Sequence, residues 1–253
     1  MKIKQHIPNT LTVFNLISGL IALTLTFKGG PGHEINYVYA SLFIFIAAVF
    51  DFLDGNAARI LNAHSELGKQ LDSLADLVSF GVAPGMMVFQ MISVHCEGSC
   101  NMFERMHISP YFAMLIPVCS ALRLAKFNID IRQEVNFIGI PTPANAIFFA
   151  SIPLVLYVQP GLFSLIHLDF LVTFFSNTRI LTILTVFFSY LLISDFKIFS
   201  MKFKSMAWMG NQLRYSFLII SLTLFILFFL SAIPVIIIIY ILMSIFFQNY
   251  IVE

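Results

Sequence analysis

Four aspartates lie in hydrophobic stretches of the chain, at spacings that could do metal chemistry. Asp51 and Asp54 are three residues apart, and Asp72 and Asp76 are four apart, so each pair would lie on one face of a helix. Four carboxylates at the centre of a bilayer cost about 10 kcal/mol if nothing compensates their charge. Because hard oxygen ligands suit Mg²⁺ or Mn²⁺, the cluster predicts two divalent ions that clamp phosphoryl oxygens.

Small and basic residues accompany the first pair of aspartates. Gly55 and Ala58 leave one helix bare beside the carboxylates, and Gly68 opens the next helix, so a ligand could approach the backbone there. Arg59, one turn beyond Gly55, could hold a phosphate with a forked pair of donors. The combination predicts a pyrophosphate ligand that carries a nucleoside.

The elements that position these residues are membrane helices. The chain is 59% hydrophobic and 11% charged, against about 25% charged in soluble domains. This composition predicts an all-α integral membrane protein, and the net charge of +1 without a basic tract argues against a nucleic-acid partner. A hydropathy pass predicts about eight transmembrane helices, near residues 11–27, 37–58, 71–94, 110–125, 143–158, 180–194, 215–231 and 234–249.

Two apolar segments do not have the length of a single membrane span. Residues 215–252 carry no charge and are too long for one span of about 20 residues, so we expect a hairpin at Pro234. Residues 159–179 are apolar but short of a span, which predicts an interfacial position. The expected organisation is a six-helix core, residues 1–205, and a C-terminal transmembrane hairpin, residues 206–253. Cys96 and Cys100 share a loop and could form a small disulfide or stay reduced.

The distribution of basic residues predicts the orientation. Eleven of the 14 lysines and arginines would lie on one side of the membrane, and that side is expected to be cytoplasmic. These eleven are Lys2, Lys4, Arg59, Lys69, Arg123, Lys126, Arg132, Lys197, Lys202, Lys204 and Arg214. The N-terminus and the aspartates, near the ends of the second and third helices, are then cytoplasmic. We expect no cleaved signal peptide, because no small-residue cleavage site precedes the first span.

The spacing Asp-x-x-Asp-Gly-x-x-Ala-Arg-x8-Gly-x3-Asp-x3-Asp, residues 51–76, resembles the signature of the CDP-alcohol phosphatidyltransferases. The resemblance implies that Asp51, Asp54, Asp72 and Asp76 bind two divalent ions, Mg²⁺ or Mn²⁺, and that Asp76 is also the general base. It further implies a site for a CDP-linked lipid, CDP-diacylglycerol. The residues expected to bind that lipid are Asn9 and Thr12 of the segment 8–12, Gly55, Arg59, Ser65 and Gly68.

Three further segments, residues 67–84, 121–128 and 139–144, resemble the phosphatidylserine synthase branch of that family, although Leu67 and Lys126 replace its usual Phe and Arg. The likeness covers residues 8 to about 205. It implies transfer of a phosphatidyl group to L-serine with release of CMP, a homodimer, and a location in the cell membrane, specifically a bacterial inner membrane.

The acceptor site is the least constrained by the sequence. The expected serine contacts are Arg123, Asn128 and Thr142. Arg123 and Asn128 are five residues apart, so both can face the site only if their helix ends near Lys126. Arg123 could instead serve only as a positive-inside charge. Two alternatives stay open: the same chemistry with another acceptor, such as glycerol 3-phosphate, or a cation-coupled transporter that uses the aspartates as an ion path.

Overall fold

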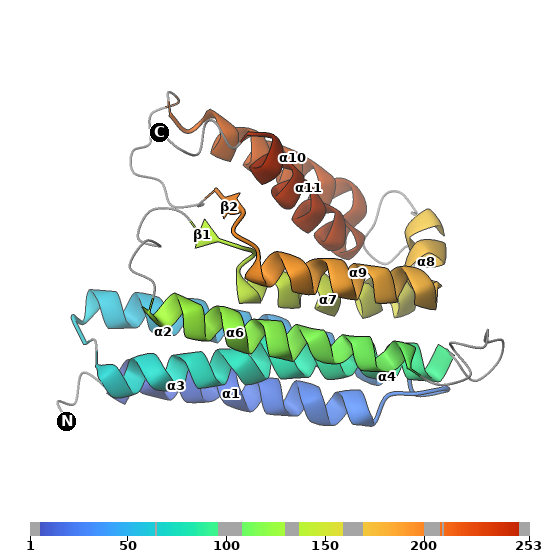
Figure 1. The fold of residues 1–253 in the computed structure, drawn as a ribbon, viewed down its shortest axis with the longest axis horizontal. Coiled ribbons are helices and arrows are strands. Elements are labelled where there is room, and N and C mark those ends of the chain that lie inside the picture. The colour runs from blue at the N-terminus through green and yellow to red at the C-terminus, as the bar shows by residue number, and fades with distance from the viewer. Residues whose placement is uncertain are drawn as a thin grey trace.

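The computed structural model describes residues 6–63, 65–95, 108–129, 137–158, 169–199, 208 and 210–247. The first two helices, α1 (His6–Phe27) and α2 (Ile35–Ile60), pack against each other along their length. Helix α3 (Glu66–Asp76) continues through a π-helical segment, η2 (Leu77–Val82), into α4 (Ala83–His95). The lower layer in Figure 1 contains α1, α2, α3, α4 and α6 (Leu115–Ile129), whose axes are nearly parallel in this view while the chain alternates in direction from one span to the next. The 3₁₀ segment η3 (Ser109–Met114) leads into α6.

A second layer packs on the first. It contains α7 (Thr142–Tyr157), the short α8 (Asp169–Ser176) and α9 (Thr178–Ile193). Helix α7 is buried on all sides over most of its length, and its Phe148 stacks on Phe188 of α9 with ring centroids 4.0 Å apart. Two short strands, β1 (Phe137–Ile138) and β2 (Lys197–Ile198), pair antiparallel beside the start of α7. Because α7 is enclosed by helices, its first residues are held in the protein interior.

The C-terminal helices α10 (Gln212–Phe228) and α11 (Ala232–Phe246) lie side by side across the second layer (Figure 1). The predicted fold-back is therefore present, but the turn is at Phe229–Ser231 (η5) and not at Pro234. Phe229 has φ 46° and ψ −122°, which interrupts the helix. Pro234 lies in the first turn of α11, where its missing N–H removes no helical hydrogen bond.

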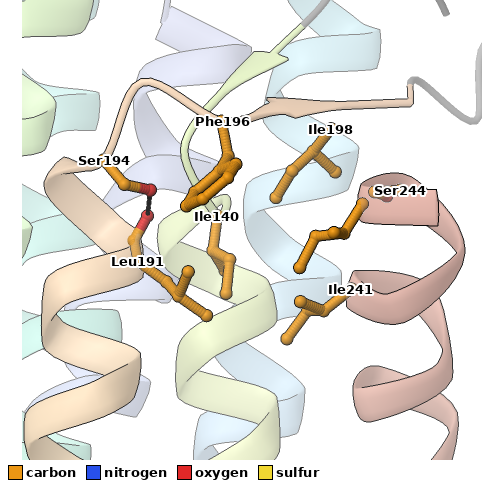
Figure 2. Close-up of a pocket in the computed structure, with 8 residues that line it drawn as sticks. Ile140, Leu191, Ser194, Phe196, Ile198, Ile241 and Ser244 are labelled. Atoms are coloured by element: carbon orange, nitrogen blue, oxygen red, sulfur yellow. Dashed lines mark hydrogen bonds between the residues drawn. The ribbon is translucent and has the colours of Figure 1, made fainter. Parts of the chain in front are cut away.

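Figure 2 shows the contact of this hairpin with the rest of the protein. Ile241 and Ser244 of α11 face Ile140, Leu191 and Ile198 across a cavity of about 10 Å³. Such a volume holds about one water molecule. The hairpin is thus closely packed on the second layer, through a mainly apolar contact.

Length and hydropathy confirm a multi-pass membrane protein. Five helices in the described residues are long and apolar enough to cross a bilayer, or six if α8 and α9, bent by 81°, form one span. That count takes Gln212–Phe246 as one span, and α7 is apolar but shorter. The predicted spans coincide in position with α1, α2, α3 to α4, α6, α7, α9, α10 and α11. Residues 96–107, which include Cys96 and Cys100, lie outside the described residues, as do residues 159–168 of the expected interfacial stretch.

Candidate active site

Three of the four aspartates converge between α2 and α3. Asp51, Asp72 and Asp76 each offer a carboxylate oxygen, and these oxygens all lie within 4.8 Å of one another. The chain brings them together because α2 ends at Ile60 and α3 begins at Glu66, so the two helices are joined by a short turn. Asp76 is only 8% exposed, whereas Asp51 and Asp72 are half-buried.

Asp54 lies one turn further along α2 and is outside this group of three. Its side chain is 5% exposed and interacts electrostatically with Asp72 and Asp51. The Thr12 side chain of α1 interacts with its carboxylate, although the Thr12 hydroxyl donates to the Pro8 carbonyl at 3.1 Å. The fourth aspartate therefore belongs to the same charged cluster, and α1 contributes to its surroundings.

The aspartate cluster fits a divalent cation. Oδ2 of Asp54 and Oδ1 of Asp72 are buried, and neither has a hydrogen-bond partner in the described part of the chain. Buried carboxylate oxygens without partners are costly unless a cation neutralises them. All the ligand atoms are hard oxygens, which suits Mg²⁺ or Mn²⁺. Asp51, Asp72 and Asp76 can therefore bind a metal ion together.

The start of α3 lies against the start of α1. Ser65 caps α3 by accepting a hydrogen bond from the Gly68 amide at 3.0 Å. A Cβ atom on Gly68 would lie 2.9 Å from Oδ1 of Asn9. The structure thus brings together Asn9, Ser65 and Gly68, three of the residues predicted to bind the nucleotide lipid.

The backbone beside Gly55 is open. Apart from its own helix backbone, a Cβ atom on Gly55 would meet no atom of the described residues within 4 Å, so a ligand has room to approach α2 there. Arg59 is exposed and lies along its own helix, donating from Nε to the Gly55 carbonyl and from Nη2 to Oδ1 of Asn56, both at 3.0 Å. The guanidinium therefore lies at the edge of the open backbone and has donors to offer an anion.

A buried cation lies near Asp76. Arg123 of α6 is 8% exposed, donates from Nη1 to Oγ1 of Thr142 at 3.0 Å, and has no partner for Nε among the described residues. Its guanidinium is close enough to interact electrostatically with Asp76 and with the Tyr240 hydroxyl. Arg123 and Thr142, predicted from the sequence as neighbours of the acceptor, are in direct contact.

Asn128 is not part of this pair. Arg123 and Asn128 could both face the site only if the chain bent near Lys126. Helix α6 instead continues to Ile129, so this bend is absent. Asn128 instead donates to the Ser73 hydroxyl at 2.8 Å, and its carbonyl accepts from Lys69 at 3.1 Å. Lys126 forms an exposed ion pair with Asp195 at 3.1 Å. The last turn of α6 therefore contacts α3 through Asn128 and the segment after α9 through Lys126.

Two residues near the site were missed from the sequence. Asn15 of α1 donates from its amide to Oδ1 of Asp76 at 3.1 Å, and an asparagine inside an apolar span could have signalled it. Tyr240 of α11 donates to the Phe199 carbonyl at 2.7 Å and is close to Arg123. No sequence pattern places residue 240 beside residue 123, because this proximity depends on how the hairpin packs.

Comparison with known proteins identifies the family of the chain. The family model for CDP-alcohol phosphatidyltransferase matches residues 5–191. A CDP-diacylglycerol--serine O-phosphatidyltransferase of Bacillus subtilis (strain 168) is 37% identical over 193 residues, which cover 76% of this chain and 89% of that protein.

Proteins of the same name from Saccharomyces cerevisiae and Mycobacterium leprae are 39% and 33% identical over 154 and 150 residues. These matches cover 55% and 56% of this chain, and they span about half of each relative, 50% and 45%. Since the family model covers most of the chain and includes all four aspartates, the chain belongs to the CDP-alcohol phosphatidyltransferase family.

Proposed function

We propose that this protein transfers the phosphatidyl group of CDP-diacylglycerol to the hydroxyl of L-serine, producing phosphatidylserine and CMP. The observation that carries the proposal is the convergence of Asp51, Asp72 and Asp76 beside the open backbone of Gly55. The relatives reported above all bear the name CDP-diacylglycerol--serine O-phosphatidyltransferase, which supports serine as the acceptor.

In the proposed reaction the serine oxygen attacks the phosphorus of the phosphatidyl group. A new P–O bond to serine forms, the P–O bond to CMP breaks, and CMP leaves with the electron pair of that bond. Asp76, the most buried of the three convergent carboxylates, accepts the hydroxyl proton as general base. Two divalent ions, Mg²⁺ or Mn²⁺, bound by Asp51, Asp54, Asp72 and Asp76, would supply the positive charge that stabilises the phosphoryl oxygens.

The protein's own residues would bind the two substrates at two separate places near Asp76. We assign the CDP moiety to the α1, α2 and α3 side, where Asn9, Ser65 and Gly68 lie together and where Gly55 leaves the backbone open. The remaining residues proposed to contact it are Thr12 and Arg59.

We assign the serine carboxylate to Arg123, whose Nε is buried without a partner in the described structure. Thr142 holds this guanidinium in place. Asn128, bonded to Ser73, would act by fastening α6 to α3. The site would face the cytoplasm, where serine and CMP are soluble, and the enzyme would work as a homodimer in the cell membrane.

One assay tests the proposed function. Purified protein in mixed micelles is given CDP-diacylglycerol, Mn²⁺ or Mg²⁺, and one acceptor at a time: L-serine, glycerol 3-phosphate, or none. CMP and the lipid product are both measured. We expect CMP release and phosphatidylserine only with L-serine. If CMP is released with glycerol 3-phosphate and not with L-serine, the acceptor is glycerol 3-phosphate. If no acceptor gives CMP release and the protein drives ion-coupled solute uptake in vesicles, the protein is a transporter and not an enzyme.

A further inference from the structure

Asn15 is buried in the middle of α1, within the membrane-spanning part of the helix. Its side chain is 0% exposed, and its Nδ2 donates to Oδ1 of Asp76 across 3.1 Å. The amide oxygen, Oδ1 of Asn15, is also buried but has no partner in the described part of the chain. A half-satisfied amide in the interior costs stability and does not add to it. Packing alone therefore does not explain an asparagine at this position.

A second hydrogen bond holds the same residue from its backbone. The Ser79 hydroxyl donates to the carbonyl oxygen of Asn15 at 3.0 Å. Ser79 belongs to η2, the π-helical segment that begins directly after Asp76, and such segments are frequent at functional sites. Asn15 is thus bonded on two sides to the same stretch of chain, once at Asp76 and once three residues beyond it.

The two stretches of chain also approach each other unusually closely. A Cβ atom on Gly19 of α1 would lie 2.3 Å from the Ser79 hydroxyl oxygen and 2.8 Å from the Ser79 Cα. Only a glycine permits this approach. One turn of α1 is therefore held against η2, and the position of Asn15 relative to Asp76 is determined by backbone packing.

We propose that Asn15 is a positioning residue for Asp76, an inference that rests on the proposed function. The Asn15 amide holds one carboxylate oxygen of Asp76, and this contact fixes the rotation of the carboxylate so that its other oxygen is presented to the reacting hydroxyl and to the ligand cluster with Asp51 and Asp72. Asn15 touches neither substrate and acts only through Asp76. Partners of this kind typically contribute about 10- to 100-fold in metal affinity or activity.

Asn15→Leu removes the amide and keeps a side chain of similar size. We expect kcat to fall about 10- to 100-fold, with the KM values for both substrates within about threefold of wild type. Mn²⁺ affinity, measured by electron paramagnetic resonance without substrate, should fall as well, because Asp76 is no longer held. The matched control is Thr26→Val, which removes a fully buried hydroxyl of α1 that donates to the Ala22 carbonyl of its own helix. It should leave kcat and Mn²⁺ affinity within twofold.

A double-mutant cycle separates positioning from a general loss of structure. If Asn15 acts through Asp76, adding Asn15→Leu to Asp76→Ala, which removes the oxygen that accepts from Asn15, should change Mn²⁺ affinity by less than twofold, whereas adding it to the wild-type protein should lower Mn²⁺ affinity strongly. Additive effects, or an Asn15→Leu enzyme with unchanged kcat and Mn²⁺ affinity, would overturn the proposal. If Asn15→Leu does not fold, Asn15→Ala takes its place, and failure of both to fold would make Asn15 a structural residue. Wild-type CMP release in the same assay tests the proposed function separately.

Discussion

Arg123 of α6 donates from Nη1 to the hydroxyl oxygen of Thr142, 3.0 Å away at the start of α7. The contact fixes a buried guanidinium near Asp76, with Tyr240 of α11 also within electrostatic reach. Three helices from distant parts of the sequence thereby enclose one cation beside the proposed general base. Substitutions at Arg123 and Thr142 can therefore test the proposed serine contacts directly.

Arg123→Lys should raise the KM for serine while the KM for CDP-diacylglycerol stays within about threefold. The reason is that a point ammonium cannot replace a forked guanidinium contact to a carboxylate, and the loss of a charge-assisted bond of about 1.5–3 kcal/mol corresponds to about 10- to 100-fold in KM. Steady-state kinetics with each substrate varied in turn provides the measurement. The control is Lys126→Ala, which breaks only the exposed pair with Asp195 and should change neither KM. If Arg123→Lys raises the KM values for serine and CDP-diacylglycerol equally, Arg123 binds the phosphate and not the serine carboxylate.

Thr142→Val should reproduce part of the Arg123→Lys effect. The substitution keeps the shape of the side chain but removes the oxygen that accepts from Nη1 of Arg123. The guanidinium then loses its orientation but keeps its charge, so serine KM should rise by less than in Arg123→Lys. If Thr142→Val combined with Arg123→Lys is no worse than Arg123→Lys alone, the two residues act as one unit.

Removal of divalent metal should abolish turnover. Without a cation, the buried carboxylates repel one another and the diphosphate, and the unpartnered oxygens of Asp54 and Asp72 stay uncompensated. Protein stripped with excess chelator should release no CMP, and Mg²⁺ or Mn²⁺ should restore the activity. NaCl at equal ionic strength serves as the control for general charge screening. Full turnover in the stripped protein would show that the reaction does not need a divalent metal.

Asp76→Asn should separate chemistry from binding. The amide keeps the size of the side chain and one oxygen for a metal, but it cannot accept the serine proton, so we expect loss of most turnover with CDP-diacylglycerol still bound. Asp51→Ala and Asp72→Ala remove ligands from the group of three and should weaken Mn²⁺ and lipid binding together. Binding of a fluorescent CDP-diacylglycerol analogue, measured beside CMP release, distinguishes the two classes. An Asp76→Asn enzyme with near wild-type kcat would exclude Asp76 as the base.

A pair of glycine substitutions should separate packing from ligand approach. Gly19→Ala places a methyl group against the Ser79 backbone and should lower the thermal unfolding temperature. The methyl group of Gly55→Ala meets no neighbouring helix or loop in the described residues, and alanine favours the helix by about 0.5–1 kcal/mol, so stability should be kept or raised. Gly55→Ala should instead raise the KM for CDP-diacylglycerol. Unchanged kinetics in Gly55→Ala would show that the nucleotide lipid does not approach α2 at this point.

The sequence by itself predicted the elements that carry the aspartates and their convergence. Residues three or four apart share a helix face, and a short turn between two helices returns the chain antiparallel, so local geometry alone brings Asp51 to Asp72 and Asp76. The apolar composition likewise predicted a multi-pass membrane protein, because a bilayer admits only backbones whose hydrogen bonds are satisfied internally. The roles of the individual site residues remain predictions.

Only the tertiary structure decided what surrounds that cluster. The contact of Asn15 with Asp76 spans 61 residues of sequence, and the approach of Tyr240 to Arg123 depends on a hairpin whose turn lies at Phe229 and not at the proline. Asn128 turns away from Arg123 because α6 stays helical to Ile129. Such relationships follow from which helix faces pack together, and in a chain this uniformly apolar the hydrophobic pattern does not distinguish one face from another. Close packing of small residues such as Gly19 makes that choice.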